Sequence, residues 1–162
     1  ESAQVPAPDV HFGRHPAQFD LERFVREAPR LARTDWLGAT WPPTLVRRAL
    51  WHQVGGYSIE FSPGMSSDND FSMKLWRAGC RVFVGVGDSL VYHFTKTSTR
   101  RIRKNDGRRQ FLMKWGMSQS AFNRYYLRRG LAVPADPVLA EPQASWGLRW
   151  QAIKGGLRRR FG

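Results

Sequence analysis

The chain has 162 residues, and its 26 Lys and Arg against 13 Asp and Glu give a net charge of +13. Hydrophobic residues make up 41% of it and aromatic residues 13%, which excludes a disordered chain and predicts one modest globular domain. The single cysteine, Cys80, excludes an internal disulfide framework, and no apolar run approaches the roughly 18 residues needed to span a bilayer.

The positive charge is concentrated in the C-terminal part. Residues 1–88 hold ten basic and ten acidic side chains, whereas residues 89–162 hold sixteen basic and three acidic ones. Such asymmetry favours an anionic partner, which could be a phosphate, a nucleic acid or an anionic membrane surface. A solvated basic face without a specific partner is the alternative.

The N-terminal region divides into an arm or connecting loop over 1–18 and a helix. Asp20 is a suitable N-cap, and Leu21, Phe24 and Val25 recur at helical spacing. This helix is expected to end near Pro29.

The next segments alternate between strand and helix patterns. The apolar run 36–41 predicts a strand, and Thr44 is an N-cap-like residue before a short helix that stops ahead of Gly55. A second helix begins at Asp68 or a neighbouring Ser and ends at Gly79. Strands are then expected over 81–86 and 89–94, and this alternation predicts an α/β fold.

The C-terminal third is basic. A loop over 95–109 is followed by a helix over 110–129, which Gly116 can divide in two. A Pro-rich linker is expected over 131–144 and a basic amphipathic tail over 145–162.

The densest polar cluster surrounds Asp68 and Asp70 at a predicted helix start. Capping of the helix accounts for one acid without any function. Two acids one residue apart do not share a helix face, so they are not a shared-proton pair. We therefore expect one of them to point to a site and the other to brace the fold.

His93 ends a predicted strand, where α/β proteins place ligand-binding residues, and its imidazole could ligate a divalent metal. A structural role is the common alternative for a lone histidine. The loop after it contains Lys96, Arg100 and Arg101, which suit either phosphate oxygens or a nucleic-acid backbone.

Several segments occur in the order found in one enzyme family. They are HFGRHPAQFDLERF, PPTLVRRALWHQVGGYSIEF, SDNDFSMKLWRAG, RVFVGVGDSLVYHF and NDGRRQFLMKWG. Together they resemble the second, acceptor-side half of bacterial family 2 glycosyltransferases over about residues 11–130. The resemblance implies a partial GT-A, Rossmann-like fold, with the acceptor-binding half over 19–130 followed by C-terminal helices.

The family pattern EDxDLxxRLxxAG aligns with SDNDFSMKLWRAG without a gap. The resemblance implies that Asp68 is the catalytic base of an inverting sugar transfer, with Asp70 as motif support. Ser67 takes the place of the family's Glu, so Asp68 has no acidic residue directly before it. It further implies a divalent Mn or Mg ion at His93 and diphosphate contacts from Lys96, Arg100 and Arg101. Trp51, Gly55 and Gly56 would shape the acceptor side.

The nucleotide-binding half of such an enzyme, with its DxD metal motif, is not expected within this sequence. The hypothesis is therefore a fragment that is inactive alone, acting on a nucleotide-sugar donor and a glycan or lipid-linked acceptor in cell-surface polysaccharide biosynthesis. The expected location is cytoplasmic, with tail 145–162 on an anionic inner membrane face. A basic nucleic-acid-binding or membrane-binding module without catalysis is the alternative, and nucleic acid is the weaker reading.

Overall fold

The computed structural model describes residues 10–63, 65–94 and 105–143. The elements, in chain order, are η1 (Pro16–Gln18), α1 (Leu21–Leu31), β1 (Trp36–Leu37), α2 (Arg48–Val54), η2 (Ile59–Phe61), α3 (Ser67–Arg77), β2 (Val84–Gly85), α4 (Gly107–Trp115), α5 (Gln119–Ala121) and the π-helical turn η4 (Phe122–Tyr126). The fold is mixed α/β, as expected. Within the described ranges, no helix has both the length and the apolar character to cross a membrane.

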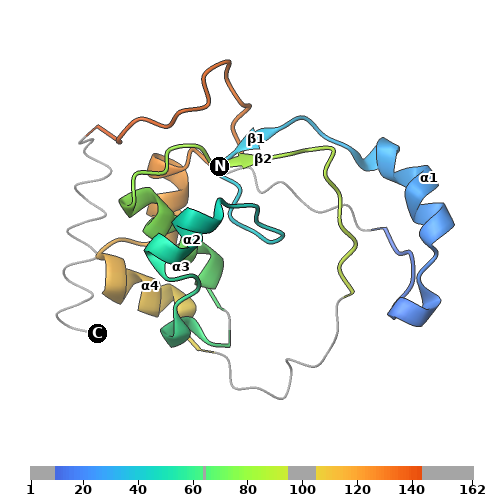
Figure 1. Ribbon diagram of the computed structural model, residues 1–162, viewed down its shortest axis with the longest axis horizontal. Helices are drawn as coiled ribbons and strands as arrows, with labels where there is room; N and C mark the ends of the chain where they lie inside the picture. Colours follow the sequence, from blue (N-terminus) through green and yellow to red (C-terminus); the bar gives the residue numbers. More distant parts are fainter. Residues whose placement is uncertain (1–9, 64, 95–104, 144–162) are drawn as a thin grey trace.

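Two parts are visible in Figure 1. The sheet and helices α2 to α5 with η4 form a body, while α1 stands apart at the other end of the molecule. We call residues 10–31 together with 88–94 the extension. The core of the body gathers eleven buried side chains, which are Leu37, Phe61, Phe71, Met73, Leu75, Trp76, Phe83, Phe111, Phe122, Leu127 and Leu139.

The sheet is smaller than the sequence predicts. Strand β1 pairs antiparallel with β2, and Trp36 lies opposite Gly85 while Leu37 lies opposite Val84. The expected strands over 36–41 and 81–86 are therefore wrong in length. Gly38 has a φ of 77°, which turns the chain out of the extended conformation directly after β1.

The strand expected over 89–94 is also wrong, because those residues form no strand. In residues 89–94 the apolar side chains Tyr92 and Phe94 alternate with His93, and aromatic packing explains this pattern. Tyr92 stacks on Phe19 at 5.2 Å between ring centroids, and Phe94 meets Phe19 edge-on at 5.4 Å. When every second residue contributes a ring to a side-chain cluster, the sequence shows the same pattern as a half-buried strand.

Helix α3 confirms the strongest helix prediction. Seven of its residues are buried: Asn69, Asp70, Phe71, Ser72, Met73, Leu75 and Trp76. The N-cap is Ser66, and Gly79 follows the helix end with a φ of 92°. A helix buried along so much of its length becomes the central support of the body.

Helix α2 ends as predicted, with Gly55 as its C-cap in the left-handed conformation. The predicted start at Thr44 is wrong, because the N-cap position is Arg47. The Thr44 side chain instead lies near the Tyr57 hydroxyl and acts to lower its pKa. Helix α2 therefore begins three residues later than the local capping signal predicts.

Helix α1 has the predicted N-cap, since the Asp20 carboxylate accepts from the backbone N–H of Arg23 at 2.9 Å. The helix ends at Leu31, close to the predicted end near Pro29. Pro29 lies in the last turn, where its missing N–H removes a single intrahelical bond. The short remainder of the helix tolerates that loss.

The helical region after residue 105 is broken, in agreement with the divided form of the prediction. Helix α4 begins at an Asp106 N-cap and ends at Gly116, whose φ is 74°. Residues 131–143, expected as a linker, form no helix and pair by one isolated bridge between Ala132 and Trp36. They nevertheless pack on the body, because Leu139 is 2% exposed.

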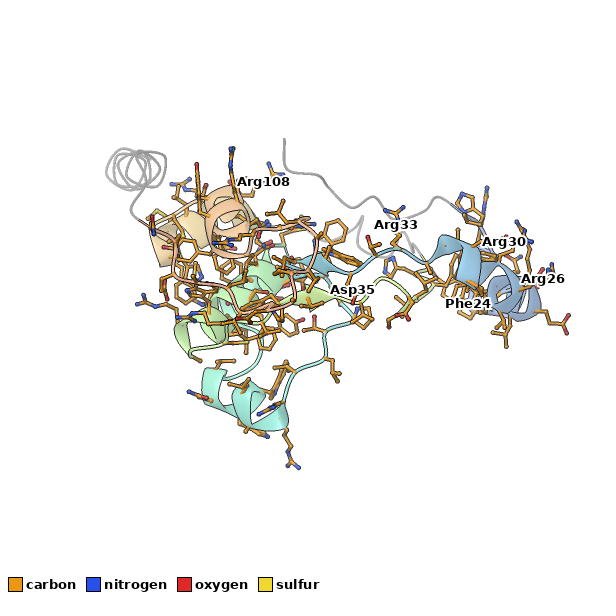
Figure 2. All side chains as sticks on the ribbon, turned by 90° about the horizontal axis from the view of Figure 1, so that it is seen from above. Phe24, Arg26, Arg30, Arg33, Asp35 and Arg108 are labelled. Carbon is orange, nitrogen blue, oxygen red and sulfur yellow. The ribbon has the colours of Figure 1, made fainter. Side chains whose placement is uncertain are left out.

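The extension is tied to the body by two chain segments that run together. The N–H of Arg33 donates to the Gly87 carbonyl at 2.9 Å, and the N–H of Gly87 donates to the Asp35 carboxylate at 2.8 Å. Figure 2 shows Arg33 and Asp35 on this connection, with Phe24 and Arg30 further out on α1. The side chains of the extension form an aromatic cluster separate from the core of the body. Its members are Phe12, Phe19, Phe24, Tyr92 and Phe94.

Candidate functional site

The candidate site lies at the N-terminal end of α3, where the two acids of the sequence motif have different environments. Asp70 is fully buried, at 0% exposure. Its Oδ2 accepts from the Ser58 hydroxyl at 2.6 Å, and its Oδ1 accepts from the Trp115 indole N–H at 2.8 Å. The Lys114 ammonium lies 2.9 Å from Oδ1 and compensates the buried charge.

Lys114 extends this network to the surface. Its Nζ lies 2.7 Å from the Glu60 carboxylate and donates to the Ser58 hydroxyl oxygen at 3.0 Å. The hydrogen bond from Lys114 is the main reason why the pKa of Glu60 is lowered. Lys74 of α3 also donates to Ser58, at 3.1 Å. Polar contacts therefore join the segment before α3 to α3 and α4, and Ser58 takes part in three of them, including the bond to Asp70.

Asp68 has a different environment. It is half-buried at the second position of α3, and the N-cap position belongs to Ser66. Its carboxylate is therefore not the helix cap that the structural alternative proposed. Burial raises the pKa of Asp68, and a hydrogen bond from Tyr57 partly offsets that rise. A half-buried carboxylate with a raised pKa suits proton transfer near neutral pH.

Tyr57 connects Asp68 to the residues expected on the acceptor side. The pKa of Tyr57 is raised by burial and then by the charge of Asp68. Its ring packs on Phe71 at 5.0 Å and on Trp51 at 5.7 Å between centroids. Trp51 and Asp68 are thus both neighbours of one tyrosine.

Gly56 explains why Trp51 can lie so close to the chain. Its φ is 60°, and a Cβ at this position would lie 2.6 Å from Cζ2 of the Trp51 indole. Its carbonyl also accepts from Lys74 at 2.5 Å. Gly55 has a φ of 71° but open space around it, so its role is to end α2.

A second polar network holds the start of α3 against α5 and η4. The Ser66 hydroxyl donates to Gln119 at 2.9 Å, and the Asn69 amide donates to Asn123 at 2.8 Å. Gln119 in turn donates to the Asn69 carbonyl oxygen. Asn69 is 2% exposed, so these bonds satisfy a buried amide and fix the orientation of the helix end next to Ser67.

Sequence reasoning missed Tyr57, Ser58, Lys114 and Trp115 as site residues. Tyr57 had a usable signal, because it is the aromatic residue directly after Gly55 and Gly56. The other three had none. Each of the three contacts Asp70 from a distant position in the sequence. Ser58 is 12 residues from Asp70, Lys114 is 44 and Trp115 is 45.

His93 is exposed and follows Tyr92 of the aromatic cluster in the extension. In the described part of the chain, no three His, Cys, Asp or Glu side chains gather as a metal-binding group would require. Lys96, Arg100, Arg101 and tail 145–162 lie outside the described residues.

No protein-family model, curated protein or solved structure matches this chain. The glycosyltransferase resemblance and the assignments made from it therefore stay predictions.

Proposed function

We propose that this chain is the acceptor-side half of an inverting, GT-A type family 2 glycosyltransferase, in which Asp68 is the general base. One observation supports this most directly. Of the two motif acids, Asp70 is completely buried and paired, whereas Asp68 is half-buried and has a raised pKa. This division suits one reacting carboxylate and one that positions the helix.

The proposed step is a single displacement. The Asp68 carboxylate takes the proton of an acceptor hydroxyl while the oxygen forms a bond to C1 of the donor sugar. The bond from C1 to the nucleotide diphosphate breaks, and the diphosphate leaves with that electron pair. Because the attack is in line, the configuration at C1 inverts without a covalent enzyme intermediate.

Tyr57 positions the base in this proposal. The Tyr57 hydroxyl is close enough to the Asp68 carboxylate to lower its pKa. In the proposed step this hydroxyl would donate to one carboxylate oxygen and leave the other lone pairs for the acceptor. Trp51, which packs edge-on against Tyr57, would contact the acceptor. Lys96, Arg100 and Arg101 would neutralise the leaving diphosphate. No step is assigned to a metal.

The wider setting follows from the same resemblance. The donor would be a nucleotide sugar and the acceptor a glycan or lipid-linked hydroxyl. The enzyme would work on the cytoplasmic side, with tail 145–162 on the anionic inner membrane surface. Activity requires a nucleotide-binding half in addition to this one.

The test is a transfer assay in the full-length protein that carries this chain, with a panel of nucleotide sugars and detection of released nucleoside diphosphate. Asp68→Asn should lower the turnover at least 10²-fold, because a general base typically supplies about that factor. Asp88→Asn, at an exposed acid of the extension, is the matched control. An Asp68→Asn protein that folds and turns over at the rate of the parent would disprove the assignment.

Tyr57→Phe gives a second readout that a structural role would not produce. Because the Tyr57 hydrogen bond lowers the pKa of Asp68, its loss should move the acidic limb of the pH–rate profile to higher pH. An unchanged limb together with a lower rate would mean that Tyr57 acts on the fold and not on the base.

A further inference from the structure

The body contains a pocket of about 520 Å³ on a different face of α3 from Asp68. Trp76 and Arg77 contribute to it from the last turn of α3, and Trp115 and Tyr126 from the helices that follow. Arg77 is nine residues after Asp68, which corresponds to roughly 13 Å along the helix axis and half a turn about it. The pocket is therefore separate from the proposed base.

One arginine of this pocket is held rigidly. Nη1 of Arg81 donates to the carbonyls of Trp76 at 2.7 Å and Cys80 at 3.0 Å. The guanidinium also lies over the Trp76 ring, 4.2 Å from its centroid. Its Nη2 donates to the Glu141 carboxylate at 2.5 Å. Arg81 is thus fixed in place before any ligand arrives.

The second arginine is not neutralised. Within the residues that the structure describes, Arg77 is exposed and has no hydrogen-bonded or ion-paired acceptor. Lys114 also borders the pocket, but its charge is already balanced by Asp70 and Glu60. Arg81 is paired with Glu141, so among the described residues that border the pocket Arg77 carries the positive charge that no carboxylate balances.

Glu141 is the acid of the pocket, and its side chain is 63% exposed. It lies on the irregular segment 131–143, which is fixed nearby by a bond from the Leu139 N–H to the Arg81 carbonyl at 2.8 Å. Burial raises the pKa of Tyr126, the charge of Glu141 raises it further, and that of Arg77 lowers it. Glu141 and Arg77 are therefore both close enough to act on the Tyr126 hydroxyl.

We propose that this pocket binds a small phosphate monoester with a ring portion, whose phosphate lies between Arg77 and Arg81 and competes with Glu141 for the Arg81 guanidinium. Two guanidiniums suit a dianionic phosphate, because each can donate two parallel hydrogen bonds to its oxygens. The ring portion packs against Trp115, which borders the same space. A concave site with aromatic walls and few convergent charges is typical of small-molecule sites.

The probes are phenyl phosphate, inorganic phosphate and phenol, titrated into the protein by isothermal calorimetry at physiological ionic strength. Phenyl phosphate should bind more tightly than the other two, since it carries both the charge and the ring. The indole N–H resonances of Trp76 and Trp115 should shift during the same titration. Phenyl phosphate binding no tighter than inorganic phosphate would overturn the ring part of the proposal.

Three substitutions locate the binding. Arg77→Gln should weaken phenyl phosphate binding roughly tenfold, the usual loss for one charge-assisted contact. Glu141→Gln should strengthen it several-fold, because the competing carboxylate is removed. Arg108→Gln is the matched control, since Arg108 is an exposed arginine of α4 (Figure 2) that does not border the pocket, and it should leave binding unchanged.

Two results would overturn the site. The first is an equal loss in Arg77→Gln and Arg108→Gln, which would mean binding to positive charge in general. The second is weaker binding in Glu141→Gln, which would mean that Glu141 supports the ligand or the fold instead of competing. Because Arg77 is exposed, its substitution should leave the thermal midpoint unchanged, and this is checked in parallel. None of these measurements depends on glycosyl transfer.

Discussion

Nζ of Lys114 lies 2.9 Å from Oδ1 of Asp70, a carboxylate with no exposed surface. The two residues come from α4 and α3, so this ion pair joins the helices that flank the candidate site. Because Asp70 also accepts from Ser58 and Trp115, its charge is compensated in the interior and not by water. Removal of the Asp70 carboxylate would leave the Lys114 ammonium and the Trp115 N–H without this acceptor.

Asp70→Ala should therefore lower the free energy of unfolding by about 3–5 kcal/mol, the usual cost of breaking a buried pair. The measurement is urea-induced unfolding followed by circular dichroism. Asp88→Ala, at an exposed acid, should change the same quantity by less than about 0.5 kcal/mol. Equal losses in the two variants would contradict the buried network.

The ionised carboxylate of Asp68 should destabilise the folded protein, in contrast to that of Asp70. Because the pKa of Asp68 in the folded protein is raised above 3.8, the folded state binds the proton more tightly than the unfolded chain does. The free energy of unfolding should therefore fall as the pH rises from 3.8 through the raised pKa. Asp68→Asn removes this penalty.

Unfolding measured across that pH range tests the sign. Asp68→Asn should be more stable than the parent protein at pH above the raised pKa of Asp68, and the difference should disappear below the unfolded-state value. A variant that is less stable than its parent at neutral pH would show that the ionised carboxylate stabilises the fold. It would then be an ordinary helix-terminal acid.

Gly55 and Gly56 form a matched pair for testing the packing of Trp51. Gly55→Ala should lower the free energy of unfolding by about 1 kcal/mol, because alanine is disfavoured at positive φ while the space around Gly55 is open. Gly56→Ala should cost a further 1–3 kcal/mol or so, since the new methyl would overlap the Trp51 ring. Near-ultraviolet circular dichroism should change in Gly56→Ala and not in Gly55→Ala. Equal costs would mean that Trp51 moves aside freely.

Tyr92 should control the extension separately from the body. Its hydroxyl accepts from the Phe12 N–H at 3.1 Å and donates to the Gly13 carbonyl at 2.7 Å. Tyr92→Phe removes both bonds, at a local cost of about 1 kcal/mol, which corresponds to roughly fivefold faster hydrogen exchange in residues 11–31. Exchange in α3 should not change. Faster exchange throughout the body would contradict this local effect.

The local signals in the sequence were good guides to the helices and poor guides to the strands. Asp20 as an N-cap, Gly55 as a helix end and Gly116 as a break were all predictable, because each acts through its own backbone and near neighbours. The strands were predicted too long, because alternation arises equally from pairing and from the aromatic packing of Tyr92 and Phe94. Local patterns do not distinguish these two causes.

The sequence also indicated that Asp68 and Asp70 would have different roles, since side chains two positions apart in a helix point in different directions. It could not tell which acid would be buried. That depends on Ser58, Lys114 and Trp115, which reach Asp70 from other elements. The position of Arg77 beside Arg81 and Glu141 has the same origin, because segment 131–143 must first fold back onto the body. Caps and periodicity act over a few residues, whereas burial and charge pairing depend on parts of the chain that only the tertiary fold brings together.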